Sequence, residues 1–264
     1  MNVVEKFNSI ALFLEAIENR PQRKNFHGCV GSDAGSKSFT KTESFDEAVK
    51  LIRDGWHEPL KDFKAVKKSN MAYTPQRKTI SDVIGHAPIV PNAIQGLPNS
   101  MIRTKKVPQK VKTIEIIYNN SVLGNVKARD MVRAGKAVLS YIRKLELEGC
   151  RVKLTGALKG SNYDGHYHIV SVKLKDYKEQ MDLLKLAFPM AHPSAMRRLG
   201  FRWYETNPDL VQSYDYGCSI DNEKTFRDVY QCDKNAKVLL AMNMVELSDE
   251  AMLDYIKTQI ETQK

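Results

Sequence analysis

Cysteine, long apolar runs and glycine-rich nucleotide motifs are all scarce in this sequence. Only four cysteines occur in 264 residues, and none of them forms a Cys-x-x-Cys pair, so neither a disulfide framework nor a standard zinc module is predicted. The apolar runs are far shorter than the roughly 20 residues of a membrane-spanning helix, and no partnership with a membrane is expected. The N-terminal segment contains Glu5 and Lys6 rather than a cleavable apolar region, which argues against secretion.

The motifs of the common enzyme classes are also missing. The chain contains no Gly-x-Gly-x-x-Gly or Gly-x4-Gly-Lys-Ser/Thr loop, no Gly-x-Ser-x-Gly elbow, and no His-Glu-x-x-His or EF-hand pattern. His166 and His168 could join Cys218 and Cys232 at a metal, but alternate residues of a strand share a face by default, and a structural role is favoured. For His192, which precedes Pro193, a solvent-exposed or capping role is favoured over a catalytic one. We therefore predict no catalytic residue, no metal site and no cofactor.

The positive charge is abundant but unevenly distributed. The whole chain carries 41 basic and 31 acidic residues, a formal net charge of +10. Residues 61–110 hold ten of the basic residues and two of the acidic ones, a net charge of +8, which leaves 31 basic and 29 acidic residues, or +2, for the other 214. The basic character is therefore concentrated in one segment, which is also rich in proline and glycine.

The periodicity of apolar residues predicts an α/β fold. Residues 112–264 are expected to form a three-layer domain with a mostly parallel sheet flanked by helices. Residues 1–60 predict a small helix-strand-helix module, in which Ser44 and Glu47 form a capping box. Residues 61–111 predict a long, irregular, basic linker or arm that contains prolines. The expected strands are 38–41, 113–118, 151–158, 168–175 and 237–245, and the expected helices are 9–20, 44–55, about 122–148, 177–186, 193–204, 224–230 and one beginning at Ser248.

Ligands of such sheets bind at the carboxyl ends of the strands, and the first loop of this kind contains Asn119, Asn120 and Ser121. The topology resembles that of von Willebrand factor A domains, in which an Asp-x-Ser-x-Ser loop at this position holds a metal. This chain has no Asp there, so the resemblance implies a fold without the metal motif.

The basic side chains are the best candidates for a binding site. Arg198 and Arg202 are neighbours on one helical face, with Arg197 beside them and Trp203 close by, and such groups can bind phosphates and stack on bases. Pairing with Glu205 or Asp209, or burial of Trp203, is the competing interpretation, and a solvated linker is the competing interpretation for the lysines. The predicted nucleic-acid-binding residues are Lys67, Lys68, Arg77, Lys78, Arg103, Lys105, Lys106, Lys110, Arg197, Arg198 and Arg202.

Several stretches resemble a family of uncharacterised tailed-bacteriophage proteins. They include Ser38-Phe39-Thr40, Gly55-Trp56, Pro91-Asn92, Lys105-Lys106 and Arg198-x-Gly200-Phe201-Arg202-Trp203, and with the stretches between them they span about residues 38–204. The resemblance implies a phage protein made in the cytoplasm of the bacterial host, or carried in the virion, and it implies no known activity.

These observations lead to a functional hypothesis with two alternatives. We expect a non-enzymatic phage protein that binds nucleic acid or nucleoprotein through the basic segment, because neutralising phosphates with many cations gives strong, salt-sensitive affinity. An acidic protein surface would serve equally well as a partner, so a virion-associated or host-targeting interaction module, or a homo-oligomer, is the first alternative. A metal-dependent nuclease without a readable motif, using acids such as Asp164, Asp215 and Asp221, is the second.

Overall fold

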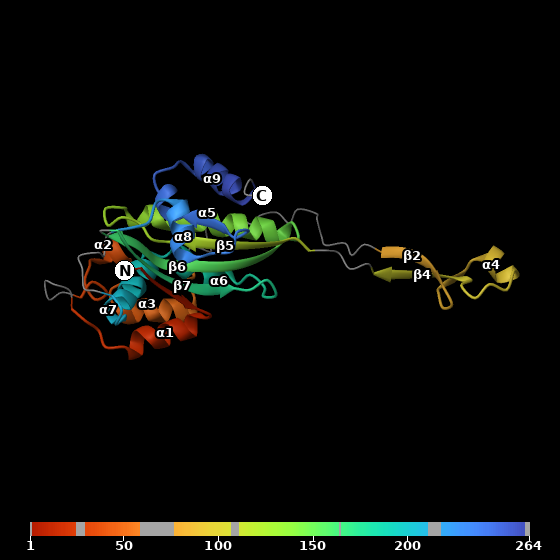
Figure 1. Cartoon of the computed structure of the whole chain (residues 1–264), viewed down its shortest axis with the longest axis horizontal. Coiled ribbons are helices and arrows are strands. Elements are labelled where there is room, and N and C mark those ends of the chain that lie inside the picture. The colour runs from red at the N-terminus through yellow and green to blue at the C-terminus, as the bar shows by residue number, and fades with distance from the viewer. Residues whose placement is uncertain are drawn as a thin grey trace.

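The computed structural model describes residues 2–24, 30–58, 77–106, 111–163, 165–210 and 218–261. Figure 1 shows two parts, a body built around one sheet and an arm formed by residues 77–106 that stands apart from it. Among the described residues, no helix is long and apolar enough to cross a membrane.

The body is built on a five-stranded sheet with the strand order β1-β7-β6-β5-β8. Strand β1 runs parallel to β7, β5 runs parallel to both β6 and β8, and β6 and β7 form an antiparallel pair. The strands are β1 (Val3–Phe7), β5 (Thr113–Asn119), β6 (Arg151–Tyr163), β7 (His166–Lys175) and β8 (Lys237–Leu240). The predicted mostly parallel sheet flanked by helices is confirmed, with one antiparallel pair within it.

Two apolar cores lie on the opposite faces of this sheet. On β5, Ile116 belongs to the larger core and Ile117 to the smaller one, because successive side chains of a strand point to opposite faces. The smaller core is closed by α8 (Glu223–Tyr230), which contributes Phe226. The larger core is closed by α1 (Ile10–Asn19), α3 (Phe45–Asp54), α5 (Ala128–Leu147), α6 (Leu183–Ala191), a π-helix (Ala195–Gly200) that continues into α7 (Phe201–Thr206), and α9 (Asp249–Glu261).

The first 58 residues belong to this same sheet and core. Strand β1, where the sequence predicts no strand, pairs with β7 at the edge of the sheet, and Phe13 and Ile52 are buried in the larger core. The predicted cap is confirmed, since the Ser44 hydroxyl accepts a hydrogen bond from the Glu47 amide. The predicted strand at 38–41 is wrong. These residues form a short helix, α2 (Lys37–Thr40), that ends at Lys41 with a positive φ of 66°.

The arm is a small antiparallel sheet rather than the irregular segment that the sequence predicts. Its strands have the order β2-β4-β3. Pro88 ends β3, Pro91 lies in the first turn of α4, and Pro98 lies in the connection to β4. The elements are β2 (Arg77–Asp82), β3 (Ala87–Pro88), α4 (Val90–Ile94) and β4 (Met101–Lys106). Local sequence patterns do not predict this sheet, because β2 pairs with a strand about 24 residues further along the chain.

Two elements in the second half of the chain also differ from the prediction. The helix expected from residue 177 begins at Leu183, where Asp182 caps it by accepting hydrogen bonds from two amides. The strand expected over 237–245 ends at Leu240, and a short 3-10 helix (Ala241–Asn243) follows. Residues 241–245 are mostly apolar, so their sequence alone does not distinguish a strand from a tightly wound turn. Residues 177–182 are mostly polar, and none of them is buried.

Candidate functional site

Five of the predicted binding residues lie on the paired strands β2 and β4, which we call the basic ribbon. Arg77 is directly opposite Lys106, and Lys78 is directly opposite Lys105. Side chains of directly opposed residues share a face of a ribbon, so the first pair projects from one face and the second pair, together with Arg103, from the other. All five side chains are exposed.

The basic ribbon contains one carboxylate. Asp82 forms ion pairs with Arg103 at 3.2 Å and with Lys105 at 3.5 Å. The pKa of Asp82 is lowered, first by the hydrogen bond from the Val83 amide and then by these cations. The other three cations, Arg77, Lys78 and Lys106, form no ion pair with the residues that the structure describes. Like charges that face each other across a ribbon repel, so an anionic partner would stabilise this arrangement.

Three further predicted residues, Lys67, Lys68 and Lys110, lie outside the described residues.

The structure places Arg197 and Arg198 inside the fold, which corrects their predicted role as contacts for nucleic acid. Both are fully buried. The Arg197 guanidinium donates to the carbonyl oxygens of Phe39 at 2.7 Å and Val126 at 2.6 Å. Arg198 donates to the Thr42 carbonyl at 3.0 Å and to the Ser32 carbonyl at 2.9 Å. The physical reason is that the loops around α2 fold over this helix and their carbonyl oxygens need donors.

Arg202 and Trp203 are likewise engaged within the body. Arg202 forms an ion pair with Asp33 at 2.7 Å and stacks on the Phe45 ring. The Trp203 indole is fully buried and donates a hydrogen bond to Glu5. Arg202 and Trp203 therefore stabilise the fold, as the competing interpretation has it.

The start of the loop after β5, the first place to look for a ligand, is closed. Asn119, Asn120 and Ser121 are fully buried, and the Asn120 amide donates to the Pro189 carbonyl at 3.4 Å. The Asn120 Oδ1 and Ser121 Oγ atoms have no hydrogen-bond partner among the described residues. They require an ordered water or a similar small partner, but no ligand can reach them from solvent in this conformation.

His192 is the C-cap residue of α6 and is buried, so the expectation of a solvent-exposed ring is wrong. His192 is stacked on Phe188, with 4.8 Å between ring centroids, and its Nδ1 atom accepts a hydrogen bond from the Ser194 amide at 3.1 Å. Burial lowers its pKa from 6.5 to about 3, so the ring is neutral at physiological pH. Across the described part of the chain, no group of three or more His, Cys, Asp or Glu side chains is placed to hold a metal ion. Of the acids considered for a nuclease, Asp164 and Asp215 lie outside the described residues.

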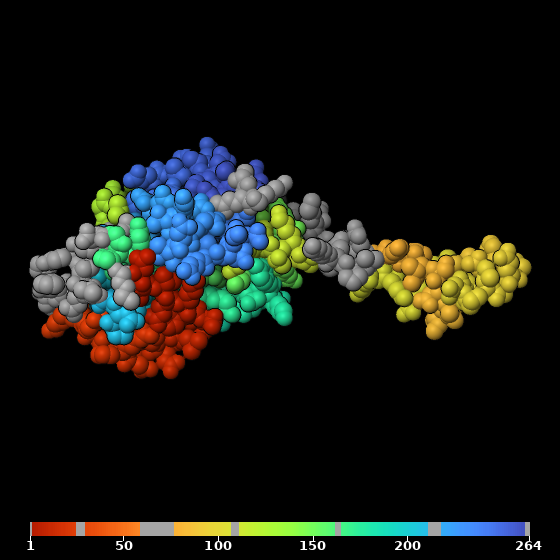
Figure 2. Space-filling model, in the orientation of Figure 1, coloured from red at the N-terminus to blue at the C-terminus, as the bar shows by residue number. Residues whose placement is uncertain are grey.

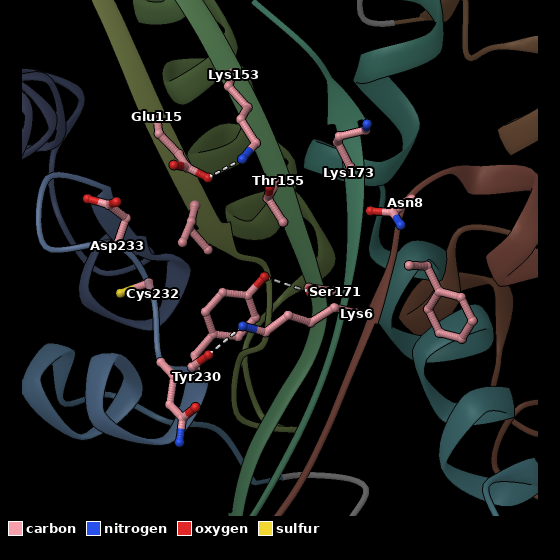
Figure 3. Close-up of a pocket in the computed structure, with 13 residues that line it drawn as sticks. Lys6, Asn8, Glu115, Lys153, Thr155, Ser171, Lys173, Tyr230, Cys232 and Asp233 are labelled. Carbon is pink, nitrogen blue, oxygen red and sulfur yellow. Dashed lines mark hydrogen bonds and ion pairs between the residues drawn. The ribbon is translucent and has the colours of Figure 1, made fainter.

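A polar pocket of about 210 Å³ opens on the face of the sheet that carries α8. Figure 3 shows lysines from three strands around it, Lys6, Lys153 and Lys173. Lys153 is paired with Glu115 at 2.8 Å, and the Tyr230 hydroxyl shares a hydrogen bond of 2.9 Å with Ser171 (Figure 3).

Lys6 is the cation of this pocket that lacks a carboxylate partner among the described residues. Its amine donates to the Tyr230 carbonyl at 2.7 Å and lies over the Tyr230 ring, and burial lowers its pKa. The pocket can therefore attract an anion, but its groups mostly satisfy one another and do not form a nucleophile with its base. Sequence reasoning missed this cluster because β1 and β7, which pair Lys6 with Ser171, are far apart in the chain.

Comparison with known proteins gives one result. A family model described as a domain of unknown function (DUF7192) matches residues 1–261. The chain belongs to the DUF7192 family. The DUF7192 match runs through the body and the arm alike, so both are within the extent of this family. No curated protein and no solved structure matches the chain.

Proposed function

We propose that this DUF7192 protein is a non-enzymatic bacteriophage protein that binds nucleic acid or nucleoprotein through the basic ribbon of its arm. The observation that carries the proposal is the placement of five exposed cations on a two-stranded ribbon that has a single carboxylate. Net positive charge on a narrow, exposed element attracts polyanions from solution. The ribbon is also slender enough for the major groove of a duplex, which admits two strands.

The proposed binding surface is the basic ribbon, and it does not include the buried Arg197 and Arg198. Two of its three unpaired cations, Arg77 and Lys106, project from one face, and Lys78 projects from the other. With the ribbon in the major groove of a duplex, the phosphates on both sides of that groove would each lie near a cation. The acidic surface of a nucleoprotein would be bound by the same charges, and the resemblance to phage proteins supports a role in the infected bacterial cell or in the virion.

The test is a fluorescence-anisotropy titration of duplex DNA and of single-stranded RNA with the whole protein. With four or five phosphate contacts, the affinity is expected to fall about 10²- to 10³-fold between 50 and 200 mM salt. The variant Lys78→Ala/Lys105→Ala/Lys106→Ala should reduce the slope of log K against log salt by about 3.

The matched control removes three exposed lysines of the body, Lys50→Ala/Lys178→Ala/Lys224→Ala. This control changes the net charge equally and should retain most of the affinity and the slope. Absence of binding at low salt, or an equal loss of affinity in both triple variants, would overturn the proposal.

A further inference from the structure

The far end of the arm, residues 83–97, carries a concentration of exposed apolar side chains, and we call it the arm tip. Eight large apolar residues are exposed in the described part of the chain, and five of them lie here. Their exposed fractions range from 45% to 81%. The five are Val83, Ile84, Val90, Ile94 and Leu97. A concentration of exposed apolar side chains on one element is typical of an interaction site.

The arm has no core of its own to explain these residues. Throughout residues 77–106 no side chain is classed as buried. A small sheet without a buried apolar face is marginally stable at best in water. Figure 2 shows the arm extending away from the body, with the tip at its far end. The tip is thus presented to a neighbouring molecule, whose surface would supply the missing burial.

The body offers a surface of matching chemistry, which we call the acidic groove. It is a pocket of about 200 Å³ between the loop after β5 and the chain that follows β8. Leu123, Met242 and Val245 contribute apolar surface, and Asp130 and Glu246 contribute carboxylates, beside one lysine, Lys127. In the sheet, β6 lies on one side of β5 and β8 lies on the other, so the connections that follow these strands diverge at β5. Proteins of the α/β class bind ligands at the carboxyl ends of the strands at such a point.

The first turn of α9 borders the acidic groove. Arg133 connects them, because it donates to the Val245 and Leu247 carbonyls and pairs with Asp249 at 3.5 Å. The exposed acids Glu250 and Asp254 follow on α9, and they and Glu246 form no ion pair with the described residues.

The arm and residues 241–261, which form α9 and one wall of the groove, carry charges of opposite sign. Residues 77–106 contain five Lys or Arg and one Asp, a net charge of +4. Residues 241–261 contain five Asp or Glu and one Lys, a net charge of −4. Two more of the eight exposed apolar residues, Leu123 and Leu253, lie in the groove and on α9. Both surfaces therefore combine apolar residues with unpaired charges, and the signs of those charges are complementary.

We propose that the arm tip docks in the acidic groove of a second copy of this chain, with α4 against Leu123 and the ribbon cations facing Glu246, Glu250 and Asp254. Each contact joins two different surfaces, the arm tip of one copy and the acidic groove of the other, and is therefore heterologous. A pair of chains can exchange arms and close, whereas one-way docking would propagate a chain of subunits. Self-association through the tip does not depend on the binding of nucleic acid.

The test measures the mass of the purified full chain, free of nucleic acid, by light scattering and sedimentation over a range of concentrations. The wild type should form dimers or larger assemblies. Ile94→Asp, at the tip, and Leu123→Asp, in the groove, should each raise the dissociation constant about tenfold or more. Glu246→Lys provides a second groove variant whose exposed side chain leaves the fold intact. Leu12→Asp is the matched control, because Leu12 is the remaining exposed apolar residue and lies on neither surface.

Mixing supplies the decisive measurement. A subunit with Ile94→Asp retains its groove, and a subunit with Leu123→Asp retains its arm, so an equimolar mixture should associate more tightly than either variant alone. A wild type that is monomeric at every concentration, association that Ile94→Asp leaves unchanged, or a mixture no tighter than its components would each overturn the proposal. Docking of the tip in the groove of its own chain would give the monomeric result.

Discussion

Gly135, in the middle of α5, lets the backbone of α6 approach closely. Helix propensity alone favours alanine at this position, because glycine in a helix interior costs about 1 kcal/mol relative to alanine. Packing argues for the opposite effect. A Cβ atom on Gly135 would lie 2.3 Å from the Met190 carbonyl oxygen and 2.4 Å from the Ala191 Cα atom. Ordinary contacts begin at 3.4 Å, so α5 and α6 would have to separate by about 1 Å in a close-packed core.

We therefore expect Gly135→Ala to lower the free energy of unfolding by about 2 kcal/mol. Overpacking against a rigid backbone costs about 3 kcal/mol, and the gain in helix propensity offsets about 1 kcal/mol of this. For a chain of this size, the melting temperature should fall by about 4–8 °C.

Urea titration and thermal melting, both followed by circular dichroism, measure these quantities. Ser140→Ala, in the same helix, is the control and should be neutral or slightly stabilising. A melting temperature of Gly135→Ala equal to or above that of the wild type would show that α5 and α6 are not packed as the structure has them.

Three further predictions concern buried charged or titratable groups. Burial lowers the pKa of His192 from 6.5 to about 3, so between these two pH values the unfolded chain binds a proton that the folded chain does not. This histidine should leave the free energy of unfolding unchanged above pH 6.5 and lower it by about 1.4 kcal/mol per pH unit below pH 6.5. His192→Asn should remove this part of the slope in urea titrations at pH 7 and pH 5, and an unchanged slope would contradict the assignment. The buried Lys175 amine forms an ion pair of 2.6 Å with the partly exposed Glu146. Glu146→Gln leaves this amine without its counter-charge, so it should destabilise the fold by about 3 kcal/mol, and more than Glu146→Leu/Lys175→Met does in the same titration. Arg198→Met should cost about 2 kcal/mol, because two or more buried carbonyl oxygens lose their donor, while the affinity of the folded protein for DNA stays unchanged; a loss of affinity without loss of stability would restore this arginine to the binding surface.

The local elements of the body could largely be read from the sequence. The Ser44 N-cap, the long apolar stripe of α5 and the β-branched strand β5 all lie where their patterns predict them. These patterns involve neighbours within a few residues, and that is the range over which helical and strand periodicity operates.

The misread elements depend on distant partners. Strand β1 is five residues long and is held by pairing with β7, about 165 residues away. The sequence predicts an irregular arm because prolines and glycines are local signals, whereas the pairing of Arg77 with Lys106 joins residues far apart in the chain. The Lys6 pocket and the closed start of the loop after β5 likewise follow from how strands and helices meet, which no local pattern encodes.

The sequence by itself determined the class of fold, most helices, and the concentration of positive charge between residues 61 and 110, because composition and periodicity are properties of adjacent residues. Only the tertiary structure decided which of the cations face solvent. Arg77 and Lys106 project from the basic ribbon, whereas Arg197 and Arg198 are buried beneath the loops around α2. The physical reason is that burial is set by the segments that pack over a side chain, and for these arginines those segments begin more than 150 residues away.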